Sequence, residues 1–344
     1  MQLSEIGEFG LIDRLRDLLG PIDAPDLIQS IDDDAAVYRV ADGRVHVVTT
    51  DALIEGVHFD RSFTPMERLG FKAMSVNVSD VAAMNARPLW ATVALGLPSH
   101  LPVEDIEALY RGFKRACGHY GVHIIGGDTT AAHALTLSIT VIGEAAEGEV
   151  VYRYGAQKDD IICVTGDVGA AFAGLKLLLQ SKDALSRNPS FVPDFENFPY
   201  VLDRQLAPTA RVEMVEAWAE ARVRPSACMD ASDGLAASVR GIMQASVCGA
   251  TIYEAALPID METRRVADRF AQDVDVYALF GGEDYELVFT MPEADLKRLP
   301  QQGLFTAIGR VGRLEDGVTI QTAEGERVPL EAETFDHFRS PDPE

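Results

Sequence analysis

The sequence has few cysteines, and their spacing matches neither a zinc site nor a disulfide framework. Cys117, Cys163, Cys228 and Cys248 are scattered along 344 residues, and no CxxC pair occurs. Disulfide-rich domains and zinc modules place their cysteines densely and at characteristic intervals. We therefore expect reduced cysteines in a cytoplasmic protein.

Membrane-targeting segments and positive charge are also lacking. No apolar run approaches the ~18 residues of a membrane span, and the N-terminal MQLSEIGEFG has neither the basic nor the apolar region of a signal peptide. There are 30 Lys and Arg residues against 54 Asp and Glu, so the net charge is −24. Such an acidic chain argues against nucleic acid or an anionic membrane as the main partner. A small anionic substrate stays compatible if cations lie between it and the protein.

The usual phosphate-binding loops are missing as well. Gly169 and Gly174 have the first spacing of a Walker A loop, but Leu175-Lys176 follows where that loop needs Lys and then Ser or Thr. No GxGxxG follows a predicted strand. Two predicted Gly-Gly turns precede acidic residues instead, in IIGGDTT (124–130) and FGGEDYE (280–286). Glycines let backbone amides approach a phosphate, although such pairs also form ordinary turns.

The composition is that of a globular protein, with 47% hydrophobic and 24% charged residues. Strand and helix patterns alternate, which predicts an α/β protein of two domains, 1–150 and 151–344. The predicted helices cover 4–19, 66–85, 103–120, 170–179, 210–221, 235–245 and 261–270. The predicted strands cover 35–40, 45–50, 89–97, 122–125, 134–145, 161–166, 227–230, 249–255, 285–291 and 305–311, with a final hairpin around 315–317.

Aspartates recur where predicted strands end or helices begin, and these positions are the main chemical signal. Ligand sites of α/β proteins gather at strand ends, and carboxylates there suit Mg²⁺ better than zinc. Thr49 and Thr50 add hydroxyl or carbonyl oxygens beside one of them. Any single aspartate can instead cap a helix or form a turn, but that explanation is weaker for the whole set, which is Asp34, Asp51, Asp80, Asp128, Asp230 and Asp233.

Two single residues, His58 and Arg153, are candidates for contacting a phosphate. A lone histidine or arginine is more often an ordinary surface or packing residue, so both interpretations stay open. Ser232 is unsuited to be a nucleophile because its neighbours are acidic.

Eight stretches spread over nearly the whole chain form a joint pattern: GEFGLI (7–12), DDDAAV (32–37), TTDALIEGVHF (49–59), KAMSVNVSDVAAM (72–84), IIGGDTT (124–130), MDASDGL (229–235), GGEDYEL (281–287) and FDHF (335–338). Taken together and in this order, they resemble the motifs of the thiamine-monophosphate kinase family, in the superfamily that includes aminoimidazole ribonucleotide synthetase. One departure is SIDDD, with Asp32 where similar proteins usually have glycine.

The resemblance implies ATP-dependent phosphorylation of thiamine monophosphate to thiamine diphosphate, the last step in making that cofactor. It implies two α/β domains with mixed rather than doubly wound sheets, and a homodimer in which the N-terminal sheets pair. It also implies several Mg²⁺ ions held by acidic groups, and it leaves open whether a monovalent cation is needed.

Carried over by motif, the resemblance also implies roles for individual residues. The implied metal ligands are Asp34, Thr49, Thr50, Asp51, Asp80, Asp128, Asp230 and Asp233, of which Asp51, Asp128 and Asp233 are the implied catalytic residues. The implied ATP contacts are Tyr110, Gly127, Asp128, Arg153 and Ser232. The implied contacts to the thiamine phosphate are His58, Glu283 and Phe335.

Three alternatives remain. One is another ATP-using synthetase of the superfamily, although the selenophosphate and hydrogenase-maturation types need a cysteine near one terminus and the first cysteine here is Cys117. The second is a nucleotide-binding relative without turnover, which ADP release would exclude. The third is a purely structural protein, which would not explain the acidic strand ends.

Overall fold

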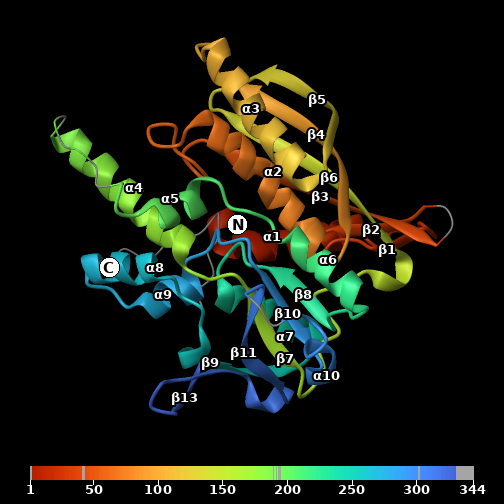
Figure 1. Ribbon diagram of the computed structural model, residues 1–344. Helices are drawn as coiled ribbons and strands as arrows, with labels where there is room; N and C mark the ends of the chain where they lie inside the picture. The colour runs from red at the N-terminus through yellow and green to blue at the C-terminus, as the bar shows by residue number, and fades with distance from the viewer. Residues whose placement is uncertain are drawn as a thin grey trace.

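The computed structural model describes residues 2–40, 43–188, 190, 192, 195–300 and 303–330, which form two mixed β-sheets with helices packed against them (Figure 1). Residues 27–146 supply the first sheet, with strand order β1-β2-β3-β6-β4-β5. Residues 161–329 supply the second, with order β13-β12-β9-β11-β7-β10-β8. The fold is therefore α/β with mixed sheets, as predicted.

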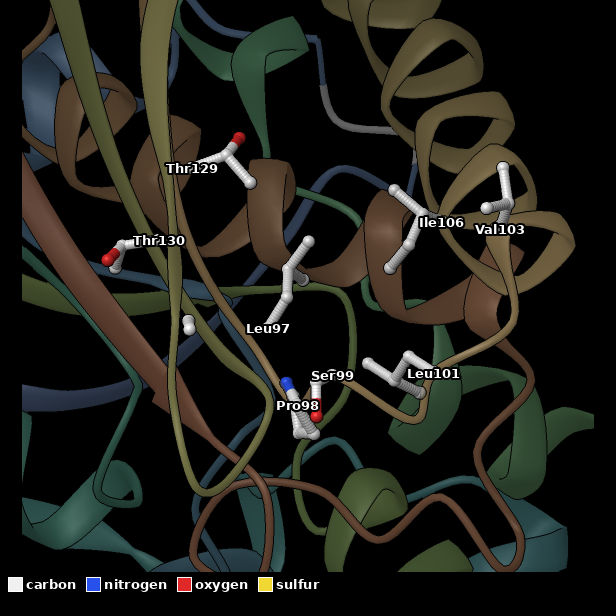
Figure 2. A pocket seen from close by; sticks show the side chains of 9 residues that line it. Leu97, Pro98, Ser99, Leu101, Val103, Ile106, Thr129 and Thr130 are labelled. Carbon is white, nitrogen blue, oxygen red and sulfur yellow. The ribbon is translucent and has the colours of Figure 1, made fainter.

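The N-terminal half contains the first sheet and three helices. Only the β4–β5 pair is parallel, and the other pairs are antiparallel. β4 leads through Pro98 and Ser99 into α3 (Figure 2). The elements are α1 (Leu3–Leu19), β1 (Leu27–Gln29), β2 (Ala36–Arg39), β3 (Arg44–Ile54), α2 (Met66–Ala83), β4 (Arg87–Leu97), α3 (Val103–Tyr120), β5 (His123–Ala131) and β6 (Thr136–Ala146).

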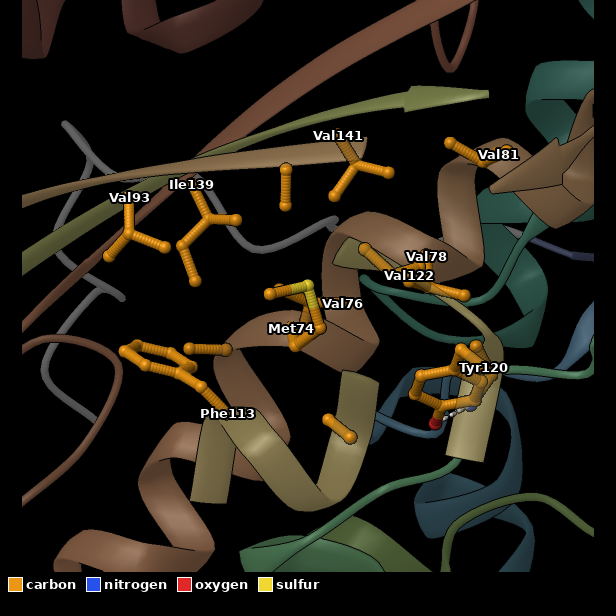
Figure 3. Close-up of a cluster of buried hydrophobic side chains, with 14 of the residues drawn as sticks. Met74, Val76, Val78, Val81, Val93, Phe113, Tyr120, Val122, Ile139 and Val141 are labelled. Atoms are coloured by element: carbon orange, nitrogen blue, oxygen red, sulfur yellow. Dashed lines mark hydrogen bonds between the residues drawn. The ribbon is translucent and has the colours of Figure 1, made fainter. Parts of the chain in front are cut away.

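Helix α2 is the central element of this half, since its residues 69–79 and 81–83 are all buried. A helix that is buried on every side has protein all around it. One side packs on the sheet, where Met74 lies below Ile139 and Val81 lies beside Val141 (Figure 3). Another side meets α3 closely: a Cβ on Gly112 would lie 2.0 Å from the backbone oxygen of Glu67.

The two faces of the first sheet have different surroundings. Along β6, buried residues such as Ile139 alternate with half-buried residues such as Thr140 and Ile142. The buried set belongs to the face covered by α2, because successive side chains of a strand point to opposite faces. The other set, which we call the open face, includes Trp90 with a relative exposure of 40%.

The C-terminal half packs its helices on both sides of the second sheet. Helices α4, α5, α8 and α9 lie together to one side of it (Figure 1). The elements are β7 (Ile161–Thr165), α4 (Ala170–Arg187), α5 (Pro199–Leu206), α6 (Val212–Ala221), β8 (Ala227–Asp230), α7 (Leu235–Ser246), β9 (Gly249–Tyr253), α8 (Met261–Phe270), α9 (Val274–Phe280), β10 (Leu287–Met291), α10 (Glu293–Leu296), β11 (Phe305–Gly312), β12 (Val318–Gln321) and β13 (Arg327–Pro329).

Several local predictions are wrong. The segment IIGGDTT is not a turn but most of strand β5, because it pairs with β4 along its length. Residues 315–317 do not form a hairpin: β12 pairs in parallel with β9, and the hairpin is instead β12–β13. Helix α4 runs to Arg187, well beyond 179, and the predicted helices do not include α5 and α9. Among the described residues, no helix is both long enough and apolar enough to cross a membrane.

Candidate functional site

Three of the predicted carboxylates converge between the two sheets. Asp34 lies two residues before the start of β2, Asp80 lies near the end of α2, and Asp230 ends β8. One oxygen atom of each lies within 4.8 Å of the others. Asp34 and Asp230 are buried, with relative exposures of 8% and 3%. The cluster therefore depends on both halves of the chain.

The hydrogen bonds of this cluster leave two acidic oxygens unpaired. Arg153 binds Oδ1 of Asp34 through Nη2 at 2.5 Å and Nε at 3.1 Å, and Thr49 Oγ1 donates to Oδ2 of Asp80 at 2.6 Å. The Oδ2 atoms of Asp34 and Asp230 are buried and have no hydrogen-bond partner among the described residues. Buried polar atoms normally have a partner, so these oxygens are suited to a cation. A carboxylate-only donor set fits Mg²⁺.

The pKa values of these carboxyl groups also indicate a cation site. Burial, followed by the charge of Asp34, raises the pKa of Asp230 to about 8. Burial and then the charges of Asp51 and Asp230 raise the pKa of Asp80 well above its ordinary value. Asp33, whose pKa is raised to about 7 by burial and then by Asp34, extends this acidic region. A bound cation would neutralise this accumulated charge.

Asp51 and Asp233 adjoin the same cluster. Burial raises the pKa of Asp51, and the charges of Asp233 and then Asp34 add to the effect. The amide of Asp51 donates to Oδ1 of Asn77 on α2 at 2.9 Å, which fixes β3 against that helix. Ser232 lies in the loop between Asp230 and Asp233.

Two predicted ligands have side chains on the open face instead. Thr50 pairs with Thr140 of β6, and their hydroxyl oxygens lie 3.1 Å apart. Asp128 pairs with Ala94, which in turn pairs with Ser138 on the same face. Since strand side chains alternate between faces, the Asp128 carboxylate points away from the face of Asp51. Within one chain, Asp128 therefore lies apart from the cluster of Asp34, Asp80 and Asp230.

The predicted ATP contacts Tyr110 and Gly127 lie near a pocket of about 470 Å³ between α3 and the ends of β4 and β5 (Figure 2). Tyr110 follows the lining residue Ile106 by one helical turn and is 42% exposed. Gly127 precedes the lining residue Thr129 by two positions on β5. A Cβ on Gly127 would lie 1.9 Å from the backbone oxygen of Val93, so glycine is required for the strands to pair there. The lining is Leu97, Pro98, Ser99, Leu101, Val103, Ile106, Thr129, Thr130 and Ala131.

The predicted substrate contacts fall in three places. His58 follows β3, and its Nδ1 accepts a hydrogen bond from the amide of Ile54 at 3.1 Å. Glu283 lies in the FGGEDYE turn, where its amide donates to the backbone oxygen of Ser232 at 2.6 Å. This bond places the turn beside the loop of Asp230 and Asp233. Phe335 and the FDHF motif lie outside the described residues.

A network of buried ion pairs holds the FGGEDYE turn. Asp284 accepts hydrogen bonds from the amides of Gly169 (2.7 Å) and Ala171 (3.2 Å) at the start of α4. Arg204 pairs with Oε1 of Glu286 at 2.8 Å, and Arg211 pairs with the same carboxylate. Burial nevertheless raises the pKa of Asp284 to about 7.

Lys72, Asn77 and Tyr285 are not among the predicted site residues. The first two are buried polar residues in α2, and polar residues inside an otherwise apolar helix were the signal that could have identified them. The pKa of Tyr285 is raised well above its ordinary value by burial and then by Glu283 and Asp51, which places its phenol beside the acidic cluster.

The unusual Asp32 occupies a position that favours glycine. Its φ is +100°, in the region that L-residues rarely adopt. Its carboxylate pairs with Arg16 at 2.6 Å on the surface. The side chain therefore points away from the cluster, while the backbone turn that presents Asp34 is retained.

Comparison with known proteins identifies close relatives over the whole chain. Residues 32–145 match the family "AIR synthase related protein, N-terminal domain". Thiamine-monophosphate kinase of Aquifex aeolicus is 36% identical over 98% of this chain and 100% of its own length. The enzyme of the same name from Bacillus subtilis is 33% identical over 90% of this chain and 93% of its own.

Solved structures agree with these sequence relatives. A structure described as AaThiL complexed with AMPPCP and TMP superposes with a TM-score of 0.83 at 36% identity, covering 98% of this chain and 99% of that one. A thiamine monophosphate kinase from Stenotrophomonas maltophilia superposes with a TM-score of 0.70 at 35% identity, covering 93% and 98%. Hydrogenase maturation protein HypE in complex with ATP, at 22% identity over 90% of each chain and a TM-score of 0.66, shares the fold.

Proposed function

The chain belongs to the thiamine-monophosphate kinase family, and from that premise we propose that it transfers the γ-phosphoryl group of ATP to thiamine monophosphate. The products are thiamine diphosphate and ADP, and the reaction completes the synthesis of that cofactor in the cytoplasm. The relative described with AMPPCP and TMP supports this choice, because AMPPCP is an analogue of ATP.

The carboxylate cluster is the observation that carries the mechanism. Asp34, Asp80 and Asp230 would hold Mg²⁺, since two of their buried oxygens have no partner among the described residues. When bound, the metal supplies positive charge that offsets the charge of the transferring phosphoryl group. Asp51 and Asp233 extend the ligand set, and Thr49 orients Asp80 through its hydroxyl group. Arg153 offers a positive charge beside the cluster, where it pairs with Asp34.

The reaction we propose is a direct in-line displacement without a phosphoenzyme. An oxygen of the thiamine phosphate forms a bond to the γ-phosphorus as the bond from that phosphorus to the ADP oxygen breaks. The acceptor phosphate is already largely ionised at neutral pH, so no strong general base is needed. Positioning and electrostatic stabilisation supply most of the rate enhancement, and the chain's residues act by orienting the two phosphates.

We assign the nucleotide base to the pocket beside Tyr110. Its lining is largely apolar, as expected for the flat face of a base. Cross-strand pairing places Gly127, Val93, Ile139 and Asp51 in one row across the sheet. Val93 and Ile139 are buried in the core, so this row connects the pocket to Asp51 through the sheet itself and not through open space. His58, Glu283 and Phe335 remain the proposed contacts to thiamine monophosphate, and Ser232 the proposed contact to ATP.

Replacement of Ile106 by glutamate tests the base pocket. A carboxylate on this wall disfavours an apolar base, so we expect the KM for ATP to rise by about tenfold or more while the KM for thiamine monophosphate stays within about twofold. Steady-state kinetics with each substrate varied measure both constants. Gly118→Glu adds the same charge to an exposed, open position of the same helix and should leave both constants unchanged. An unchanged KM for ATP in Ile106→Glu would show that the nucleotide base binds elsewhere.

The open face of the first sheet supports a homodimer. It carries Trp90 and Ile142 side by side, and the edge strand next to them carries Ile125 at 59% exposure. Exposed apolar surface of this kind marks interaction sites. Asp128 and Thr50 lie on the same face, so a second copy packed there would give them surroundings that one chain lacks. Their proposed ligand roles therefore depend on the dimer.

Replacement of Trp90 by glutamate tests this interface. A charge there would have to be buried in the dimer, which is costly, so we expect the solution mass to fall from two chains to one. Light scattering after size-exclusion chromatography measures it. Leu314→Glu, at a position exposed by 58% on the other half of the chain, should leave the mass unchanged. A wild-type protein that elutes as a monomer contradicts the proposal.

The overall function is tested by product formation. Purified protein with ATP and Mg²⁺ should release ADP only when thiamine monophosphate is present, with thiamine diphosphate formed in equal amount. If ADP stays at background with thiamine monophosphate but is released with another phosphorylated substrate, the chain is a different synthetase of the superfamily. Background ADP with every substrate would leave a nucleotide-binding protein without turnover.

A further inference from the structure

Lysine 72 is buried in the middle of α2, with a relative exposure of 2%. Lysines are rarely buried to this extent unless they are paired. The Nζ atom lies 2.9 Å from Oε1 of Glu283 and donates to the backbone oxygen of Gln205 at 3.3 Å. The ammonium group therefore joins α2 of the first half to the FGGEDYE turn and to α5 of the second half.

The Glu283 carboxylate is held from both sides. Oε1 accepts from Lys72, and Oε2 accepts from Nε2 of Gln205 at 2.7 Å. Its side chain keeps 28% exposure, so part of it remains available to a ligand. The backbone is also constrained, with φ values of +70° at Gly282 and +59° at Glu283. Residues in this sparsely populated region persist only where surrounding contacts hold them.

We propose that Lys72 is a positioning residue that fixes the Glu283 carboxylate for recognition of the cationic thiamine portion of the substrate. This inference rests on the proposed function and on the proposed role of Glu283. With 3% side-chain exposure, Lys72 does not reach a ligand and acts through its partner. A fixed carboxylate accepts a ring amino group at lower entropic cost than a mobile one. Lys72 therefore affects thiamine monophosphate and not ATP.

The test is a double-mutant cycle of Lys72→Met and Glu283→Gln, read in the KM for each substrate. In Lys72→Met we expect the KM for thiamine monophosphate to rise about tenfold or more, the fold-change of one lost charge-assisted hydrogen bond. The KM for ATP should stay within about twofold. The double variant should be no worse than Glu283→Gln alone, because Lys72 acts through that carboxylate. Lys72→Arg should recover part of the loss, since the positive charge is kept.

A matched control separates positioning from general stability. Tyr120 is also buried and bridges Ser75 of α2 (2.8 Å) and the amide of Ala210 (3.0 Å), but it makes no contact with Glu283. Tyr120→Phe should lower the melting temperature and leave both KM values unchanged. If Lys72→Met does not fold, Gln205→Met removes the donor to Oε2 and should raise the same KM.

Each contrary outcome has a distinct meaning. Equal changes in both KM values, or a double variant worse than Glu283→Gln, overturn the positioning role while the proposed function stands. A wild-type protein that forms no thiamine diphosphate overturns the proposed function, and this inference falls with it.

Discussion

Replacement of Asp51 by alanine lowers kcat by about 10²-fold or more at saturating Mg²⁺, by analogy with the loss of other groups that stabilise charge in a transition state. The same variant is expected to be more stable than the wild type when metal is absent. Burial, together with Asp233 and Asp34, raises the pKa of the Asp51 carboxyl, so its charge destabilises the folded chain at neutral pH. Activity and metal-free stability should therefore change in opposite directions.

Two measurements check this prediction: turnover with both substrates saturating, and thermal unfolding in the presence of a chelator. Glu216→Ala is the matched control, because it removes one carboxylate from an exposed position on α6. It should change neither quantity appreciably. Wild-type turnover in a folded Asp51→Ala protein would show that Asp51 does not contribute to catalysis. Reduced metal-free stability would mean that its carboxylate contributes favourable contacts that outweigh the repulsion.

The sequence predicts much of the acidic cluster because its members occupy recurrent positions. Asp230 ends a strand and Asp34 precedes one, and strand ends gather at ligand sites. Asp128 was harder to place, because IIGGDTT reads as a turn when taken alone. In the structure the segment pairs with β4, and the alternation of strand side chains then assigns Asp128 to the open face. Tertiary pairing decides this, not local preference.

The remaining elements are hard to predict from the sequence because contacts between distant segments determine them. Helix α2 has a strong apolar pattern, and the predicted range 66–85 agrees with it to within two residues, whereas α5 and α9 are short and carry little periodic signal. The parallel pairing of β12 with β9 joins segments about 70 residues apart and has no local signature. Similarly, Lys72 and Glu283 are separated by 211 positions, so no spacing rule relates them.

The second large effect is the response of stability to pH and Mg²⁺. Folding raises the pKa of Asp230 from 3.8 to about 8 and that of Asp33 to about 7. Between about pH 4 and pH 8 the folded chain therefore holds protons that the unfolded chain has released. Stability contributed by a carboxyl with a raised pKa is lost as the pH rises through the folded value. The metal-free protein should accordingly lose stability from pH 5 to pH 8.

Bound Mg²⁺ should oppose this loss, because it replaces the protons that the cluster gives up. We expect Mg²⁺ to raise the melting temperature little at pH 5 and strongly at pH 8. At pH 8, Mg²⁺ at one hundred times its dissociation constant should add about 3 kcal/mol to the free energy of unfolding. Thermal unfolding over this pH range, with Mg²⁺ or with chelator, measures the effect. In Asp230→Asn the dependence on Mg²⁺ should weaken.

Part of the pH dependence should remain when Mg²⁺ is bound. Asp284 has a pKa raised to about 7 by burial, and its oxygens face backbone amides and Arg204 rather than the cluster. A cation bound between Asp34, Asp80 and Asp230 therefore does not change the titration of Asp284. A Mg²⁺ effect of equal size at pH 5 and pH 8 would show that the metal does not compete with protons, and would place it away from these three carboxylates.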